Sequence, residues 1–207
     1  TTASNNTAVG KDALRVNTTG YSNTALGYGT LYKIVTHANN TGIGFAALSN
    51  SVAADNTAVG SQALQETTSG ASNSALGYRA LYLNTTGASN VAVGLNALYA
   101  NTTATGNTAV GLDALKLNTT GASNTAVGYN ALDSCTTGLG NTAVGSTCLQ
   151  GLTTGSHNTS IGRSGGGITT GSSNISFGYD VLSGTCTGSQ NVYIGQSNGD
   201  SAVSGSN

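Results

Sequence analysis

The sequence contains no proline, methionine or tryptophan, and only 6% of its 207 residues are charged. The absence of proline suits a β-sheet in which every backbone N–H takes part in a hydrogen-bond ladder. The net charge is −1 and no Lys/Arg cluster occurs, so we expect no nucleic-acid partner and no anionic-lipid surface. No apolar run approaches the roughly 20 residues that span a bilayer, so we expect no membrane insertion.

The residues that carry catalysis or bind metals are scarce and scattered. The two histidines, His37 and His157, lie far apart in turn segments, and Asp12 and Asp113 share one position of a repeat but are six repeats apart. No Cys-x-x-Cys pair and no repeated calcium-binding aspartate column occurs, and the glycines of 165–167 lack the lysine and helix of a phosphate loop. We therefore expect no enzyme, no catalytic or metal-binding residue and no cofactor.

The three cysteines are an odd number and occupy different positions of the repeat. They are Cys135, Cys148 and Cys186. Because no two of them share a position in neighbouring repeats, a disulfide framework is not expected, and we predict buried free thiols.

The feature that organises the chain is the phrase Asn-Thr-Ala-Val-Gly-Tyr-Asn-Ala-Leu, which occupies 124–132 and recurs twelve times with small changes. The spacings are 17 residues except two of 16. The first residue of each repeat is Asn6, Asn23, Asn40, Asn56, Asn73, Asn90, Asn107, Asn124, Asn141, Asn158, Asn174 and Asn191. Four residues later come Gly10, Gly27, Gly44, Gly60, Gly77, Gly94, Gly111, Gly128, Gly145, Gly162, Gly178 and Gly195. So short and constant a period predicts one elongated solenoid domain over 1–207.

The repeat predicts strands rather than helices. Thr-Ala-Val is short and alternating, which is typical of a strand of three to four residues that the glycine ends, and Thr-Thr-Gly predicts a second short strand. Several glycines in each repeat would each destabilise a helix by roughly 1 kcal/mol. We therefore expect an all-β, parallel β-solenoid of twelve coils, stacked about 4.8 Å apart and roughly 55–60 Å long.

Strand alternation assigns the two faces of each coil. We expect Val127 and its equivalents to point inward with Leu132, and the alanine between Thr and Val to point outward. A file of outward alanines predicts a flat interchain face, formed by Ala75, Ala92, Ala109, Ala126 and Ala143. The alternative is that a tight coil needs small residues for internal reasons. The asparagines should hydrogen-bond along the axis at a turn, where Asn also tolerates the left-handed conformation.

Tyrosines and threonines offer candidate binding surfaces. One tyrosine column contains Tyr28, Tyr78, Tyr129 and Tyr179, and a second contains Tyr32, Tyr82 and Tyr99. Exposed rings on a rigid surface predict contact with glycans or another partner, although rings of this kind also pack along a ridge or between chains. A threonine ladder raises ice binding as a weaker alternative: Thr18, Thr68, Thr85, Thr102, Thr119, Thr136, Thr153 and Thr170. Four asparagines lie in Asn-Thr-Thr glycosylation sequons: Asn17, Asn84, Asn101 and Asn118.

The phrase Asn-Thr-Ala-Val-Gly followed by Ala-Leu resembles the repeats in the YadA-type heads of trimeric autotransporter adhesins. It resembles even more the N-T-A-V-G-Y-x-A-L repeats of phage tail-fibre proteins and large bacterial surface proteins. The resemblance covers essentially the whole chain and implies a trimeric β-roll that binds host surfaces. The period differs from that of the adhesin heads, and no neck, stalk or anchor is recognisable.

These observations predict a non-enzymatic, extracellular structural or adhesive fibre, located on a cell surface or a virion. Its main partner would be further copies of itself, as a homotrimer or, because neither end carries an evident cap, as a head-to-tail filament. Surface glycans are a further candidate partner.

Overall fold

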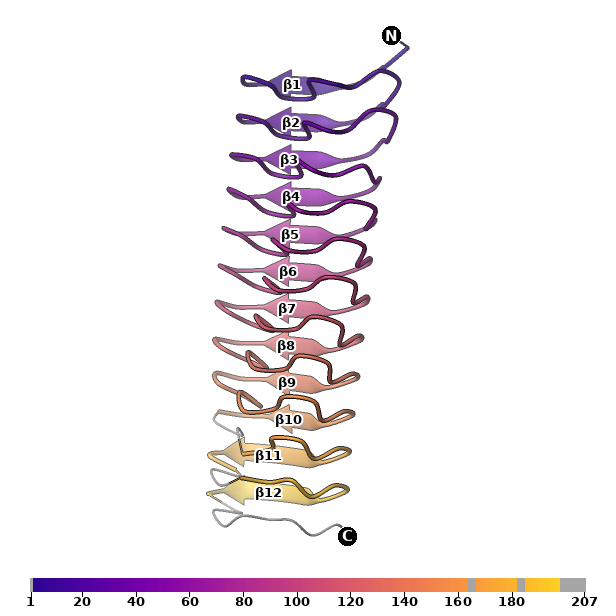
Figure 1. The fold of residues 1–207 in the computed structure, drawn as a ribbon. Helices are drawn as coiled ribbons and strands as arrows, with labels where there is room; N and C mark the ends of the chain where they lie inside the picture. Colours follow the sequence, from indigo (N-terminus) through magenta and orange to yellow (C-terminus); the bar gives the residue numbers. More distant parts are fainter. Residues whose placement is uncertain (1, 164–166, 182–184, 198–207) are drawn as a thin grey trace.

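The computed structural model describes residues 2–163, 167–181 and 185–197, which form a β-solenoid of about 17 residues per turn (Figure 1). Twelve parallel strands make one sheet in sequence order, and these residues contain no helix. The strands are β1 (Thr7–Val9), β2 (Thr24–Leu26), β3 (Thr41–Ile43), β4 (Thr57–Val59), β5 (Ser74–Leu76), β6 (Val91–Val93), β7 (Thr108–Val110), β8 (Thr125–Val127), β9 (Thr142–Val144), β10 (Thr159–Ile161), β11 (Ile175–Tyr179) and β12 (Val192–Gln196). The predicted fold class is confirmed.

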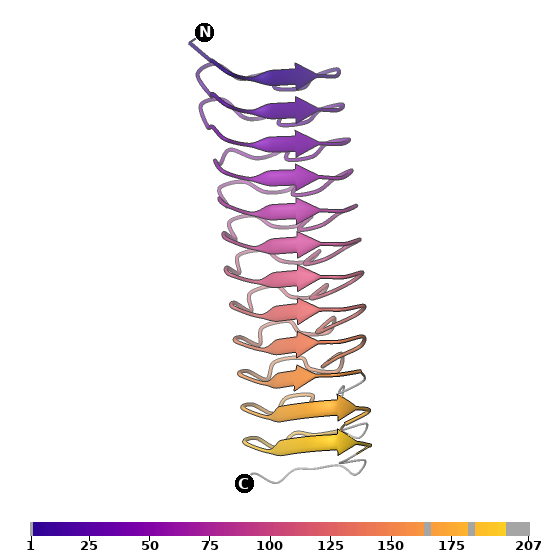
Figure 2. The same cartoon turned by 180° about the vertical axis from the view of Figure 1, so that it is seen from behind.

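Equivalent residues of successive coils lie directly above one another. Thr125 pairs with Thr142, and the two 16-residue repeats keep the same register, as in the pairing of Thr41 with Thr57. Seen from behind, the strands form an evenly stacked column that runs from one end of the molecule to the other (Figure 2). At about 4.8 Å per step, the sheet is roughly 53 Å long from β1 to β12.

The predicted second strand at Thr-Thr-Gly is wrong. These segments are bends, and outside the twelve strands the described chain has one isolated bridge, Ile168 with Cys186. They still bond to the next coil, because the Thr119 backbone N–H donates to the Thr136 carbonyl over 2.9 Å. Single hydrogen bonds of this kind hold the coils in register without a continuous ladder.

The predicted directions of the strand side chains are also wrong. Ala126 is fully buried and Val127 is half-buried, while Val9 and Leu76 are 56% and 51% exposed. The side chains of the strand do alternate between the two sides of the sheet, but the alanine points inward and the valine outward, the reverse of the prediction. Leu132, which does point inward as expected, already fills the narrow interior together with Ala131, so only a methyl group fits behind the strand.

Left-handed backbone at single residues allows this tight coil. After the strand, Gly128, Asn130 and Leu132 have φ values of 137°, 51° and 52°. Non-glycine residues reach this region at some energetic cost, so the fold uses it only at isolated turn positions. A Cβ on Gly128 would lie 2.3 Å from the Gly145 carbonyl oxygen, which explains why the first of these positions is glycine.

The asparagine column forms the predicted hydrogen-bond ladder along the axis. The Asn141 backbone N–H donates to the Asn124 Oδ1 over 2.9 Å, and the Asn141 Nδ2 donates to the Gly155 carbonyl over 2.9 Å. From Asn23 onward these side chains are buried. The asparagine itself is not left-handed, contrary to our expectation: the residue before it is, as in Ser123 with φ of 58°.

We predict that Ala109→Leu lowers the free energy of unfolding by about 1–3 kcal/mol, because the added atoms have no room in the packed interior. The matched change Val110→Leu, on the outer side of the same strand, should alter stability by less than about 0.5 kcal/mol, since Leu26 and Leu76 occupy that position naturally. Urea unfolding of both variants measures the difference. The opposite ranking would mean that the valines point inward.

We predict that Asn124→Ala lowers the free energy of unfolding by about 2–5 kcal/mol. The change removes the acceptor of the Asn141 N–H and the amide donor to the Gly138 carbonyl, which keeps only a weak bond from the Cys135 thiol. Asn50→Ala is the control, because Asn50 is half-buried and its side chain makes one contact, with Glu66. Equal thermal stability of the two variants would contradict this role of the ladder.

Candidate interaction surfaces

The outer side of the sheet presents three parallel columns of side chains, one residue of each per coil. The Thr column consists of Thr7, Thr24, Thr41, Thr57, Ser74, Val91, Thr108, Thr125, Thr142, Thr159, Ile175 and Val192. The Val column consists of Val9, Leu26, Ile43, Val59, Leu76, Val93, Val110, Val127, Val144, Ile161, Phe177 and Ile194. The Tyr column consists of Lys11, Tyr28, Phe45, Ser61, Tyr78, Leu95, Leu112, Tyr129, Ser146, Arg163, Tyr179 and Gln196. We call these three columns together the outer face.

The Tyr column shares this face because the strand conformation continues past the glycine. In β11, Ile175, Phe177 and Tyr179 are exposed while Ser176 is buried, which is the alternation of a strand with one side inward. In shorter strands the backbone bonds continue in the same way: the Asn130 N–H donates to the Leu112 carbonyl over 3.0 Å. The outer face is therefore three columns wide along the sheet.

The outer face is nearly free of charge, and its middle column is apolar. Its Val column is entirely apolar, and Lys11 and Arg163 are the charged residues in all three columns. Leu26, Phe177 and Ile194 are 46%, 37% and 65% exposed. Contiguous apolar surface of this kind generally marks an interaction site. The sequence pattern identified the valines but, with the phase inverted, assigned them to the interior.

The predicted interchain face of alanines is wrong. Ala92, Ala109, Ala126 and Ala143 have no exposed surface, and Ala75 is 2% exposed. These residues form part of the core, so the alternative explanation, an internal need for small residues, is the correct one.

The tyrosines of the Tyr column are exposed, as a partner contact requires. Tyr28, Tyr78, Tyr129 and Tyr179 have 44–53% of their surface exposed, and each is separated from the next by three coils. The structure therefore does not bring them together. Tyr28 instead stacks on Phe45 in the next coil, with ring centroids 5.5 Å apart.

The second tyrosine column is half-buried and packs along a ridge. Tyr82 and Tyr99 stack with centroids 5.4 Å apart, and the Arg15 guanidinium lies 5.7 Å from the Tyr32 ring. The Arg79 guanidinium lies 5.0 Å from the Tyr78 ring and 5.4 Å from the Tyr82 ring, which links the two columns. Such cation–π contacts hold the rings in place.

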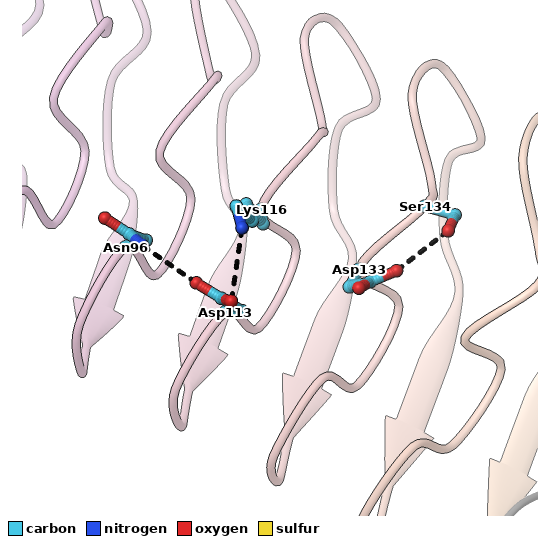
Figure 3. Close-up of polar contacts among 5 residues, drawn as sticks. All are labelled: Asn96, Asp113, Lys116, Asp133 and Ser134. Carbon is cyan, nitrogen blue, oxygen red and sulfur yellow. Dashed lines mark hydrogen bonds and ion pairs between the residues drawn. The ribbon is translucent and has the colours of Figure 1, made fainter.

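Polar side chains in the turn that follows the Tyr column form short local contacts (Figure 3). Asp113 accepts from the Asn96 Nδ2 over 3.0 Å and pairs with the Lys116 Nζ at 3.2 Å, and the Ser134 hydroxyl donates to Asp133 over 2.8 Å. Asp113 and Asp133 are thus each paired with side chains of their own or the neighbouring coil.

In the part of the chain that the structure describes, no group of three or more His, Cys, Asp or Glu side chains is placed to hold a metal ion. The same part has no helix long and apolar enough to cross a membrane.

The three cysteines are buried free thiols, as predicted. Burial raises the pKa of the Cys135 thiol to about 11, against a weaker lowering effect of a backbone hydrogen bond with Gly138. Burial also raises the pKa of Cys148. Because the thiolate is the reactive form, both side chains should react slowly with thiol reagents in the folded protein.

The threonine ladder and the sequons have structural roles. The Thr102 hydroxyl donates to the Thr119 carbonyl of the next coil over 3.1 Å. The last predicted member, Thr170, is wrong, because the Thr153 hydroxyl donates to the carbonyl of Thr169 instead. The sequon residues Asn84, Asn101 and Asn118 are buried, with the Asn101 Nδ2 donating to the Asn84 Oδ1 over 2.8 Å. In the folded chain these three amides are inaccessible to a glycosylating enzyme.

Comparisons of this chain with protein-family models, with curated proteins and with solved structures give no match.

Proposed function

We propose that this protein is a non-enzymatic structural or adhesive fibre segment that associates with copies of itself outside the cell. The single observation that carries the proposal is the uninterrupted twelve-strand sheet, whose outer face carries the apolar Val column along its whole length. An elongated body of this kind has stiffness along its axis and a long side for lateral contact.

The repeat supports a mechanical role because each coil depends on its neighbours. The apolar interior of one coil consists of Ala126, Ala131, Leu132 and Cys135, and its asparagine bonds to the coils on both sides. A solenoid with such nearest-neighbour contacts is stable only as a stack, so bending or breaking it exposes buried polar groups.

The surface composition supports a place outside the cell. The exposed turns are built from Thr, Ser, Asn and Gly, and with 6% charged residues the protein lacks the net charge that usually keeps intracellular proteins apart. Such a surface suits a fibre whose copies remain in contact. The exposed tyrosines of the Tyr column add a second candidate role, the binding of glycans by ring stacking.

The test is negative-stain electron microscopy of the purified chain together with light-scattering mass at increasing concentration. We expect straight rods and a mass that is a multiple of 20.2 kDa. Compact particles, or rods that keep a mass of 20.2 kDa at every concentration, would rule out a self-associating fibre. Immunogold labelling of the cells or virions that carry the protein should place these rods on the outside.

A further inference from the structure

We propose that the outer face is the contact between two copies of this chain, which pack face to face with their long axes antiparallel. This inference rests on the proposed function and adds to it the interface, the direction of the second copy and the register. The two-fold axis lies between the two sheets, parallel to β6. Each strand therefore faces the strand of the second copy whose number, added to its own, gives twelve. β1 then faces β11, and β6 faces itself.

The area of the outer face is adequate for a specific interface. Eleven facing coils span about 48 Å, and the three columns are about 15 Å wide, which gives on the order of 700 Å² per copy, close to the roughly 800 Å² per partner of a standard interface. The exposed side chains at its centre are large and apolar, as in Leu76, Leu95 and Leu112. Burial of this strip would therefore stabilise a pair considerably.

A second copy suits this face better than a charged partner. The Thr and Val columns contain no charged residue, so they offer nothing to a polyanion or an acidic peptide. Another neutral sheet leaves no buried charge without a partner in these columns. The hydroxyls of the Thr column face the equivalent hydroxyls of the second copy and can bond to them.

The register follows from the sizes of the side chains in the Tyr column. In this register β8 faces β4, so Tyr129, which follows β8, lies opposite Ser61, which follows β4. In the same way β3 faces β9, and Phe45 lies opposite Ser146. These two rings thus meet small side chains, while Tyr78 lies opposite Leu112, and the large/small pairs permit close packing of two otherwise flat sheets. Leu95 lies on the axis and faces itself. A shift by one coil in one direction would place Tyr78 on Tyr129 and Ser61 on Ser146, which gives a collision and a gap. A shift by one coil in the other direction would place Tyr129 on Phe45, a collision of two rings.

The same register also gives partners to the two cations of the outer face. Arg163, whose guanidinium lies 5.5 Å from its own Tyr179 ring, faces Tyr28 of the second copy. Lys11, whose ammonium lies 5.8 Å from its own Tyr28 ring, faces Tyr179 of the second copy. Each cation would then lie between two aromatic rings, an arrangement that favours it after desolvation.

Cross-linking of single-cysteine variants tests this arrangement. The reagent is a bifunctional thiol cross-linker that spans the sheet-to-sheet distance of about 10 Å. The full chain is used, and because the native cysteines are buried, the unchanged protein gives the background. Leu95→Cys and Tyr129→Cys alter exposed side chains, so both variants should fold.

We expect Leu95→Cys to form cross-linked dimers with itself. Tyr129→Cys should not, because its two copies are separated by four coils, about 19 Å along the axis. Tyr129→Cys should, however, cross-link when mixed with Ser61→Cys.

A second experiment measures the affinity of the pair. Val93→Lys, at the centre of the outer face, should raise the dissociation constant of the dimer by about 100-fold or more, since each pair would bury two unpaired charges. Leu117→Lys, at an exposed site away from the outer face, is the matched control and should leave the mass unchanged.

Three results would overturn the proposed face-to-face dimer, and they differ in what they imply for the proposed function as a fibre. A mass of three chains would support the proposed function but place the contact elsewhere. Equal cross-linking of Leu95→Cys and Tyr129→Cys with themselves would mean unspecific stacking. A monomer that is retained on an insoluble polysaccharide, and loses retention in Tyr129→Ala, would make the outer face a glycan-binding surface and would contradict self-association altogether.

Discussion

The stacking of identical polar groups along the axis is the constraint on which the rest of this structure depends. Each buried asparagine accepts the backbone N–H of the next asparagine and donates to a turn carbonyl, as Asn124 does with the Asn141 N–H and the Gly138 carbonyl. A buried polar group without a partner costs about 1–3 kcal/mol, and this cost would recur in every coil. The ladder therefore fixes the register, and the period must be nearly constant for the ladder to continue.

The narrow coil that this ladder imposes determines which side chains remain outside. Left-handed residues such as Asn130 and Leu132 turn the chain so sharply that a typical coil buries one leucine, two alanines and one further side chain, such as Asn118 or Leu152. The larger apolar residue of each strand, the one in the Val column, then has no room inside. Its place on the outer face is a consequence of geometry, and the apolar strip that results is the feature that connects the fold to a proposed assembly.

The sequence was sufficient to predict the fold class, the coil boundaries and the inward leucines, because a fixed period constrains them strongly. It was not sufficient to orient the strand. Thr-Ala-Val alternates in either phase, and a large apolar side chain such as Val127 normally marks the interior. Only the volume already occupied by Leu132 and Ala131 decides the matter. The repeat alignment predicts both tyrosine columns. The contacts of Arg79 with Tyr78 and Tyr82 depend on the geometry of the turn, which the repeat pattern does not specify.

The most direct test of the central role of the asparagine ladder is native-state hydrogen exchange of the asparagine amides. We predict that the backbone N–H groups of Asn107, Asn124 and Asn141 exchange only with global unfolding, since each donates to a buried side chain at 2.8–2.9 Å. The N–H of exposed turn residues such as Thr137 should exchange much faster. Rapid exchange of the asparagine amides at the centre of the rod would contradict the account, because the coils would then not be held together by this ladder.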